Sequence, residues 1–181
     1  MNRNIPKSMT DKLIIVCIIL FIPCMIGSNF IAHFGASNFG VFHEHHFYQL
    51  LTAMLCHANL MHLFCNMISL KSVGSLIESI YGETKMFILF IITGMLATFV
   101  SILTQPSITT VGASGAICGL IGAFLAVMKK ENCMTMEVLA QALFPIILVF
   151  FVPNVDSMAH LAGLASGYVV GKLFYNPRVQ W

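Results

Sequence analysis

The chain has 181 residues, of which 58% are apolar and only 9% charged, and its mean hydropathy is +0.88. Because a soluble domain carries about 25% charged residues and a disordered segment is polar throughout, this composition excludes both classes. The net charge of +2, with no basic cluster longer than Lys129-Lys130, gives no sign of a nucleic-acid partner, so we expect the chain to lie in a lipid bilayer.

Six apolar stretches approach the length of about 20 residues that a helix needs to cross a hydrocarbon core. They cover residues 13–32, 52–77, 86–103, 112–128, 138–152 and 158–174. The fifth stretch is short and contains Pro145, which predicts a kinked or tilted helix. The connection 33–51 is rich in aromatic residues and nearly uncharged, as is typical of a loop in the interfacial layer. The predicted fold is all-α, a polytopic membrane protein with six transmembrane helices.

The distribution of basic residues agrees with six spans and predicts their direction. All nine basic residues precede the first stretch, flank the turn after the second, follow the fourth or stand at the end of the chain: Arg3, Lys7, Lys12, Lys71, Lys85, Lys129, Lys130, Lys172 and Arg178. If both termini are cytoplasmic, all of them lie on the cytoplasmic side, as the positive-inside rule requires. The sequence therefore predicts a cytoplasmic N-terminal tail (1–12), a membrane domain (13–175) and a cytoplasmic C-terminal tail (176–181) in the cell (inner or plasma) membrane.

The cysteines and histidines do not have the spacing of a metal site. The six cysteines are scattered through apolar stretches without a C-x-x-C pair, which favours a role as small apolar side chains. His57 and His62 are five residues apart, which is poor geometry for two metal ligands on one helix. The His43-Glu44-His45-His46 cluster is interpreted as an interfacial polar patch, with adventitious metal binding as the alternative. We therefore expect no metal and no cofactor.

Three of the predicted helices carry polar residues at comparable depth. With cytoplasmic termini, the stretches 52–77, 112–128 and 158–174 all run inward from the outer face. Their unusual polar residues lie in the outer halves: His57, His62 and Asn66 in the first, Ser114 in the second and His160 in the third. Polar side chains inside a membrane are costly and mark functional sites. The sequence therefore predicts a site that opens to the extracytoplasmic side.

Ser114 stands in the segment Gly112-Ala113-Ser114-Gly115, with glycine close by on both sides. The glycines leave the hydroxyl uncrowded at the start of a helix, where the first amides have no intrahelical partner. Such amides are suited to stabilise a developing oxyanion, so Ser114 is a candidate nucleophile. The alternative is a serine that bonds its own backbone or packs as a small residue.

His160 begins a glycine repeat made by Gly163, Gly167 and Gly171. Small residues at every fourth position let two helices approach closely in lipid. The stretch 112–128 offers a matching face: Gly115, Gly119, Gly122 and Ala126. Packing of these faces is predicted to bring His160 to Ser114 as a general base. The alternative is a histidine that only hydrogen-bonds a neighbouring helix. Asp156, four residues before His160, is interpreted as a solvated turn residue.

His62 and Asn66 are four residues apart and share one face of their helix. They are predicted to donate hydrogen bonds to an oxyanion beside Ser114. His57 is rotated by roughly 140° from His62, so we assign it a structural role.

These residues resemble those of the rhomboid family of intramembrane serine proteases. The resemblance covers about residues 47–174 and rests on the Gly112–Gly115 segment, His160 with its glycine repeat, the spacing of His57, His62 and Asn66, and Glu78. It implies a rhomboid-like helical bundle in which Ser114 is the nucleophile, His160 is the base and no catalytic acid takes part. It also implies that His62, Asn66 and the Ser114 amide form an oxyanion hole.

The resemblance further implies substrates that are transmembrane proteins and that enter laterally past a mobile fifth span. Gly112, Gly115, Cys118, Gly163 and Gly167 are expected to support the site. The sequence departs from the family at two places. Tyr48-Gln49 stands where the family often has Trp-Arg, and Cys118 stands where an aromatic residue often packs on the histidine.

Two other functions are weighed against proteolysis. One is a proteolytically inactive rhomboid-like protein that binds or chaperones membrane proteins, which predicts a degraded Ser or His position. The other is a small transporter or proton relay, which predicts intramembrane acidic residues and an internal repeat. Ser114 and His160 are both intact, and neither intramembrane acids nor a repeat is evident.

Overall fold

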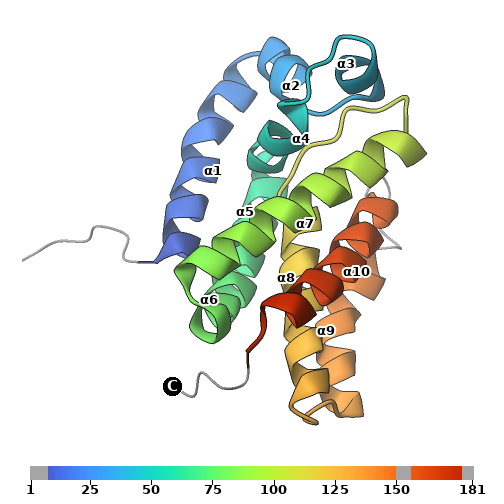
Figure 1. The fold of residues 1–181 in the computed structure, drawn as a ribbon. Helices are drawn as coiled ribbons and strands as arrows, with labels where there is room; N and C mark the ends of the chain where they lie inside the picture. Colours follow the sequence, from blue (N-terminus) through green and yellow to red (C-terminus); the bar gives the residue numbers. More distant parts are fainter. Residues whose placement is uncertain (1–7, 150–155, 177–181) are drawn as a thin grey trace, which may run out of the picture.

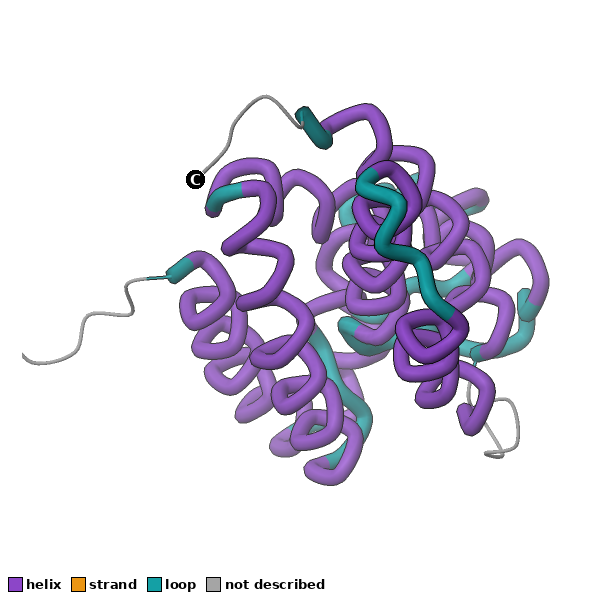
Figure 2. The backbone as a smooth tube through the Cα atoms, turned by 90° about the horizontal axis from the view of Figure 1, so that it is seen from below, coloured by secondary structure: helices purple, strands orange, loops and turns teal. Residues whose placement is uncertain are grey.

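The computed structural model describes residues 8–149 and 156–176 (Figure 1). Its elements in chain order are α1 (Met9–Ile26), α2 (Ser28–Phe34), α3 (Asn38–Phe42), α4 (Gln49–Thr52), the 3₁₀ turn η1 (Ala53–Leu55), α5 (Leu60–Ser69), the π-helical turn η2 (Leu70–Gly74), α6 (Ser75–Tyr81), α7 (Glu83–Thr104), α8 (Ser114–Lys130), α9 (Met136–Val149) and α10 (Ser157–Phe174). The described residues contain no strand, only an isolated antiparallel bridge between Ala36 and Thr110 (Figure 2). The prediction of an all-α fold is confirmed for this part of the chain.

Three helices in the described ranges are long and apolar enough to cross a membrane. They are Met9–Ile26, Leu60–Tyr81 and Glu83–Thr104, the second of which joins α5, η2 and α6. The end of the fifth stretch at 150–152 and parts of both predicted tails (1–7 and 177–181) lie outside the described residues.

Two predicted helix boundaries are wrong, and local backbone conformation explains both. The stretch 13–32 consists of two helices, because Gly27 is extended (φ −152°) and separates α1 from α2. The long helix expected from residue 52 begins at Leu60 instead. Asn59 is extended there, and its side chain accepts a hydrogen bond from the His62 amide at 2.8 Å. A side chain that caps the first turn in this way fixes the start of a helix.

The core is built around α8, which packs against both α7 and α10. Eleven of the 17 residues of α8 are buried, and most of them are small or aliphatic. Without a hydrophobic driving force between helices in lipid, such small residues gain stability by close van der Waals packing. Helix α8 is therefore the central helix of the bundle.

Helices α8 and α10 meet backbone to backbone along the predicted glycine faces. A Cβ atom at Gly163 would collide with the carbonyl oxygen of Gly115, and one at Gly167 would collide with that of Gly119. A Cβ atom at Gly122 would likewise collide with the carbonyl oxygen of Leu164. The predicted close approach of these two helices is confirmed, and it is possible only because these positions lack side chains.

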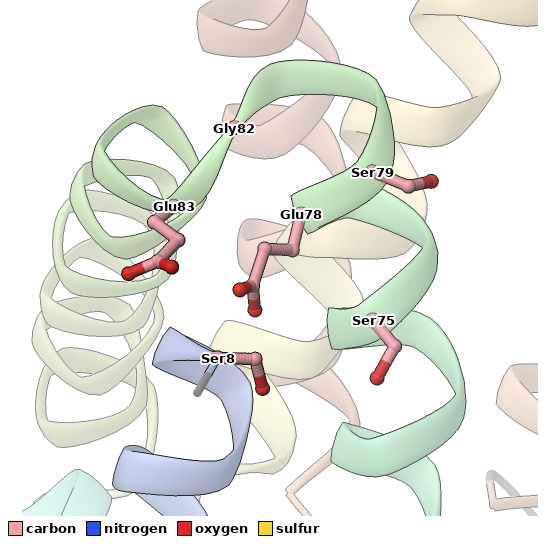
Figure 3. A pocket seen from close by; sticks show the side chains of 6 residues that line it. All are labelled: Ser8, Ser75, Glu78, Ser79, Gly82 and Glu83. Atoms are coloured by element: carbon pink, nitrogen blue, oxygen red, sulfur yellow. The ribbon is translucent and has the colours of Figure 1, made fainter. Parts of the chain in front are cut away.

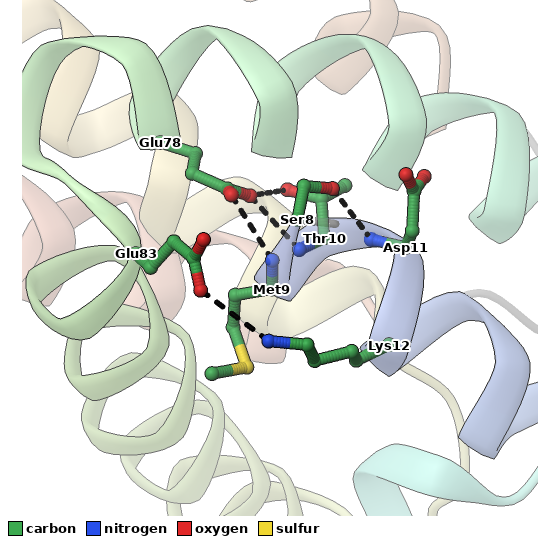
Figure 4. Close-up of polar contacts among 7 residues, drawn as sticks. All are labelled: Ser8, Met9, Thr10, Asp11, Lys12, Glu78 and Glu83. Carbon is green, nitrogen blue, oxygen red and sulfur yellow. Dashed lines mark hydrogen bonds and ion pairs between the residues drawn. The ribbon is translucent and has the colours of Figure 1, made fainter. Parts of the chain in front are cut away.

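The start of α1 is held by a side chain from α6. The Glu78 carboxylate accepts hydrogen bonds from the Met9 amide (3.0 Å), the Thr10 amide (2.9 Å) and the Thr10 hydroxyl (2.6 Å) (Figure 4). The first amides of a helix lack intrahelical partners and form the positive end of its dipole, so a carboxylate is favourable there. Glu78 therefore docks α1 onto the rest of the bundle.

The end of α10 lies near the same end of the bundle and is also tied down. The Tyr81 hydroxyl lies 3.2 Å from the Ala123 carbonyl oxygen and 3.1 Å from that of Gly171. Lys85 donates to the Phe174 carbonyl (3.0 Å) and Lys130 to the Tyr175 carbonyl (3.0 Å). Cationic side chains at a helix C-terminus satisfy its free carbonyls. These contacts help to set the position of α10 relative to α8.

Replacement of Glu78 should destabilise the protein far more than replacement of its neighbour Glu83. In Glu78→Ala the α1 amides lose a charged acceptor, and hydrogen bonds to charged groups contribute about 1.5–3 kcal/mol each. At a loss of about 2 kcal/mol, the unfolding temperature of the detergent-solubilised protein should fall by about 4–8 °C.

Glu83→Ala is the matched control. Glu83 makes only an exposed ion pair with Lys12 (3.4 Å), and such pairs contribute about 0–1 kcal/mol. Equal changes in unfolding temperature for the two variants would contradict the docking role of Glu78.

Candidate active site

Ser114 and His160 lie within hydrogen-bond distance of each other. The Ser114 Oγ atom is 2.8 Å from the His160 Nε2 atom. Ser114 is the first residue of α8, and His160 lies in the first turn of α10. The His160 side chain is buried, with 4% of the residue exposed, while Ser114 is partly exposed. The two predicted residues thus form a pair in which an imidazole nitrogen can take the proton of a hydroxyl.

The second ring nitrogen of His160 has no protein partner. Its Nδ1 atom is buried and makes no hydrogen bond with the described residues. For Nε2 to accept the Ser114 proton, Nδ1 must carry the ring hydrogen. Asp156, four residues before His160, caps α10: its Oδ1 atom accepts from the Ala159 amide at 2.9 Å. Its Oδ2 atom is buried and, among the described residues, makes no hydrogen bond. The interpretation of Asp156 as a solvated turn residue is wrong in this respect.

The peptide before Ser114 has a conformation that favours glycine. Gly112 has φ +119°, a region that L side chains rarely adopt. A Cβ atom there would also lie 2.6 Å from Cε1 and 2.7 Å from Nε2 of His62. The imidazole of His62 therefore lies directly against the backbone of Gly112, two residues before the hydroxyl. His62 therefore brings a possible hydrogen-bond donor from α5 close to the start of α8.

Asn66 lies one turn after His62 on α5 and is buried. Its Nδ2 atom donates to the His62 carbonyl at 2.8 Å, which holds the carboxamide on the same face as His62. Because an amide NH₂ has two hydrogens, one remains for another acceptor. His57 is fully buried, and its ring centre is 5.2 Å from that of His62. His57 therefore packs behind the ring that faces Gly112.

The remaining predicted residues support the contact between α8 and its neighbours. A Cβ atom at Gly115 would lie 2.5 Å from the Ala97 side chain, so this glycine lets α7 approach as well. Cys118 is buried in the interface, and its Cβ atom is 3.4 Å from the position that a Cβ at Gly163 would take. Cys118 thus faces α10 at Gly163, which lies one turn after His160.

One residue that the sequence reasoning did not place in the site is Gln49. It is 2% exposed; its Nε2 atom donates to the His33 carbonyl (3.1 Å), and its Oε1 atom accepts from the Ser37 amide (3.3 Å). Gln49 therefore cross-links the loop between α2 and α4, at the position where the related family often has arginine. The sequence feature that marks Gln49 is its position as a polar residue between the apolar Phe47-Tyr48 and Leu50-Leu51 pairs.

This cross-linked loop is bonded to the segment that leads into Ser114. Ala36 and Thr110 exchange two backbone hydrogen bonds, of 3.0 and 2.8 Å. The Gly112 amide donates to the Ala53 carbonyl at 2.9 Å, and the Ser101 hydroxyl is bonded to that of Thr110. The position of the serine is thus set by the loop as well as by α8.

No group of three histidine, cysteine, aspartate or glutamate side chains in the described ranges is arranged to hold a metal ion. The structure has an open hollow of about 390 Å³ beside Glu78, lined by Ser8, Ser75, Glu78, Ser79, Gly82 and Glu83 (Figure 3). None of the predicted site residues lines this hollow.

The Rhomboid domain family model matches residues 44–177, a range that includes every predicted site residue. RHOMBOID-like protein 1 of Arabidopsis thaliana is 32% identical over 140 residues, which are 74% of this chain and 36% of that protein. Rhomboid protease GluP of Bacillus subtilis (strain 168) is 30% identical over 140 residues, 75% of this chain and 27% of GluP. Inactive RHOMBOID-like protein 8 of A. thaliana is 28% identical over 141 residues, 74% of this chain and 40% of that protein. The chain spans about a quarter to a half of the length of the curated relatives it matches.

The replacement Gly112→Ala should destabilise the protein, because a side chain there is strained by φ +119° and collides with the His62 ring. Strained backbone positions cost about 1–3 kcal/mol each, so we expect a clear fall in the unfolding temperature. The matched control is Gly27→Ala, since Gly27 is extended and a Cβ there meets nothing within 4 Å.

A double-mutant cycle separates the two causes. In the Gly112→Ala background, His62→Ala should recover part of the lost stability, because it removes the colliding ring. If the two substitutions are strictly additive, His62 does not lie against Gly112 and its assignment to the site is wrong.

Proposed function

The chain belongs to the rhomboid family, and from this premise we propose that it is a serine endopeptidase that hydrolyses peptide bonds in or near the transmembrane helices of membrane proteins. The observation that carries the proposal is the 2.8 Å distance between Ser114 Oγ and His160 Nε2. The relative GluP, which is named as a rhomboid protease, supports the same activity.

In the proposed mechanism His160 is the general base. As Ser114 Oγ attacks the scissile carbonyl carbon, Nε2 takes the hydroxyl proton and later gives it to the leaving amine nitrogen. Water then attacks the acyl-enzyme, with the same nitrogen as base. The proposed dyad uses no catalytic acid, so the orientation of His160 depends on its burial between α8 and α10.

The oxyanion formed on the substrate carbonyl requires hydrogen-bond donors. We assign this role to His62, Asn66 and the Ser114 amide. The His62 ring lies against Gly112, and the Ser114 amide is at the first position of α8, where no intrahelical acceptor is present. Donors that are fixed before the reaction are more effective than water, because no reorganisation is needed as the charge develops.

The proposed membrane arrangement has six transmembrane helices and cytoplasmic termini in the cell (inner or plasma) membrane. In this arrangement all nine basic residues are cytoplasmic, and the starts of α8 and α10, which carry Ser114 and His160, lie toward the extracytoplasmic side. We propose that substrate helices enter laterally past α9. The partners of the protein are thus the lipid bilayer and transmembrane protein substrates.

The second candidate function is that of a proteolytically inactive rhomboid-like protein that binds other membrane proteins. One relative is named as inactive, so family membership by itself does not assign catalysis. The intact pair of Ser114 and His160 favours proteolysis over this alternative.

Cleavage by the purified protein tests the proposal. The wild type should cut a generic transmembrane substrate in detergent, and Ser114→Ala and His160→Ala should each lower the turnover by more than about 10³-fold. The matched control is Ser166→Ala on α10, whose hydroxyl only donates to the Gly163 carbonyl at 3.0 Å. Wild-type protein that is folded and binds the substrate without cutting it would favour the inactive alternative, and full activity in Ser114→Ala would exclude this serine as nucleophile.

The oxyanion role of Asn66 makes a separate prediction. Asn66→Ala should lower kcat by about 10²–10³-fold with little change in KM, because the lost donor acts only in the transition state. Asn38→Ala is the control, since this carboxamide also donates to a backbone carbonyl (Ile102, 3.0 Å) but belongs to α3, which carries none of the predicted site residues. An unchanged kcat in Asn66→Ala would remove this residue from the oxyanion hole.

A further inference from the structure

The connection from α2 to α4 exposes imidazole and aromatic rings that are paired with one another. The rings of Phe39 and His43 are stacked with their centres 5.2 Å apart. His45 pairs with Phe47 at 6.0 Å, and His46 pairs with Tyr48 at 5.3 Å. We call these six residues the paired-ring surface. Phe39 is 62% exposed, Phe47 59% and Tyr48 43%, so little protein covers this surface.

The backbone beneath these rings is well bonded. The His46 amide donates to the Gly40 carbonyl at 2.9 Å, and Asn38 donates to the Ile102 carbonyl of α7 at 3.0 Å. The Phe42 ring lies edge-on to Phe99 of α7, with the ring centres 6.0 Å apart. The paired-ring surface is therefore a shaped platform rather than a loose loop.

The platform, which includes α3, lies at one end of the bundle, beyond α1 and beside the end of α7, whereas α6 and the start of α7 lie at the other end (Figure 1). Both α1 and α7 are long and apolar enough to cross a membrane. In the proposed membrane arrangement, a segment at their ends therefore lies at the membrane–water interface. Aromatic rings are favoured at this depth, beside the lipid headgroups. The paired-ring surface thus faces the zone in which lipid phosphates lie.

The charge of this surface depends on its histidines. Residues 33–55 contain no lysine or arginine, and their one acidic residue, Glu44, is 3.2 Å from the His46 ring. The packed elements add few titratable groups: α2 has His33, while α4, the end of α7 and residues 105–113 have none. Histidine gains its charge between about pH 8 and pH 5. Each histidine adds one positive charge when it is protonated, so protonation of all four histidines of this region takes its formal charge from −1 to +3.

We propose that the paired-ring surface binds the phosphate groups of anionic lipids when its histidines are protonated. The imidazolium groups pair with the phosphates, while Phe39 and Phe47 contact the acyl chains next to the headgroups. Each imidazolium is further stabilised by the face of its neighbouring ring, as in a cation–π contact. A free phosphate ion would use only the charges, so the exposed rings favour a lipid as the ligand. This binding does not depend on proteolysis.

Fluorescence quenching in lipid discs tests the proposal. The reporter protein carries Phe47→Trp together with Trp181→Phe, which replaces the single natural tryptophan. It is placed in phosphatidylcholine discs that contain brominated phosphatidylglycerol or brominated phosphatidylcholine. At pH 5.5 the brominated anionic lipid should quench more strongly, with an enrichment beside the reporter of about fivefold for each histidine that contacts a phosphate. At pH 7.5 the two lipids should quench equally.

The histidines are tested by replacement in the same reporter. His43→Gln, His45→Asn and His46→Gln together should abolish the preference at pH 5.5; asparagine is chosen for His45 because this residue has φ +59°. His43→Gln alone should lower the preference for the anionic lipid at pH 5.5. This single variant keeps the test valid if the triple variant does not fold. Lys172→Gln on α10 is the control and should leave the preference unchanged.

Three results would overturn the proposal. They are equal quenching by both lipids at pH 5.5, a preference that persists in the folded triple variant, and loss of the preference when inorganic phosphate replaces chloride at constant ionic strength. The last result would indicate a site for soluble anions instead of lipids. Because no cleavage is measured, failure here leaves the Ser114–His160 proposal untouched, and an inactive protein can still show the lipid preference.

Discussion

The backbone contact between α8 and α10 is the constraint on which the candidate site depends. Ser114 is the first residue of α8 and His160 lies in the first turn of α10, so their separation follows from how closely the helices approach. The approach is limited by atoms of the backbone itself, because Gly163 and Gly167 meet the carbonyl oxygens of Gly115 and Gly119. In lipid, where apolar side chains gain nothing by leaving water, this kind of contact is the main source of helix–helix stability. The same glycines therefore hold the bundle together and bring a hydroxyl to 2.8 Å from an imidazole.

The position of Ser114 is also constrained by the residues that precede α8. The residues before α8 form an irregular segment, and irregular backbone inside a membrane protein needs partners for its amides and carbonyls. The loop after α2 supplies them through the Ala36–Thr110 bridge and the Ala53–Gly112 hydrogen bond. The loop is in turn cross-linked by Gln49. The site is thus built where a tightly packed helix pair meets a well-bonded loop, and the His62 ring covers the glycine between them.

The two ends of the bundle have different roles. One end carries the candidate site and the paired-ring surface, while the other carries the contacts of Glu78, Tyr81, Lys85 and Lys130 that fix α1 and α10. The C-terminus of α10 is held by these contacts, and its length packs against α8. Both therefore help to fix the position of His160 near its N-terminus. This division agrees with membership in a family whose members include a protease and a protein named as inactive, since the same scaffold can be kept while the site changes.

The sequence by itself determined the helical class, the residues of the candidate site and the glycine faces, because apolar length, polar residues within spans and four-residue spacing are local properties of the chain. It could not set the start of α5, which depends on the extended conformation and cap of Asn59. It also placed Asp156 in solvent, whereas its side chain caps α10. Only the tertiary structure decided that Gln49 cross-links the loop, that His62 lies on Gly112 and that Glu78 holds α1. These contacts join residues far apart in sequence, and their geometry follows from how the helices pack, not from any local pattern.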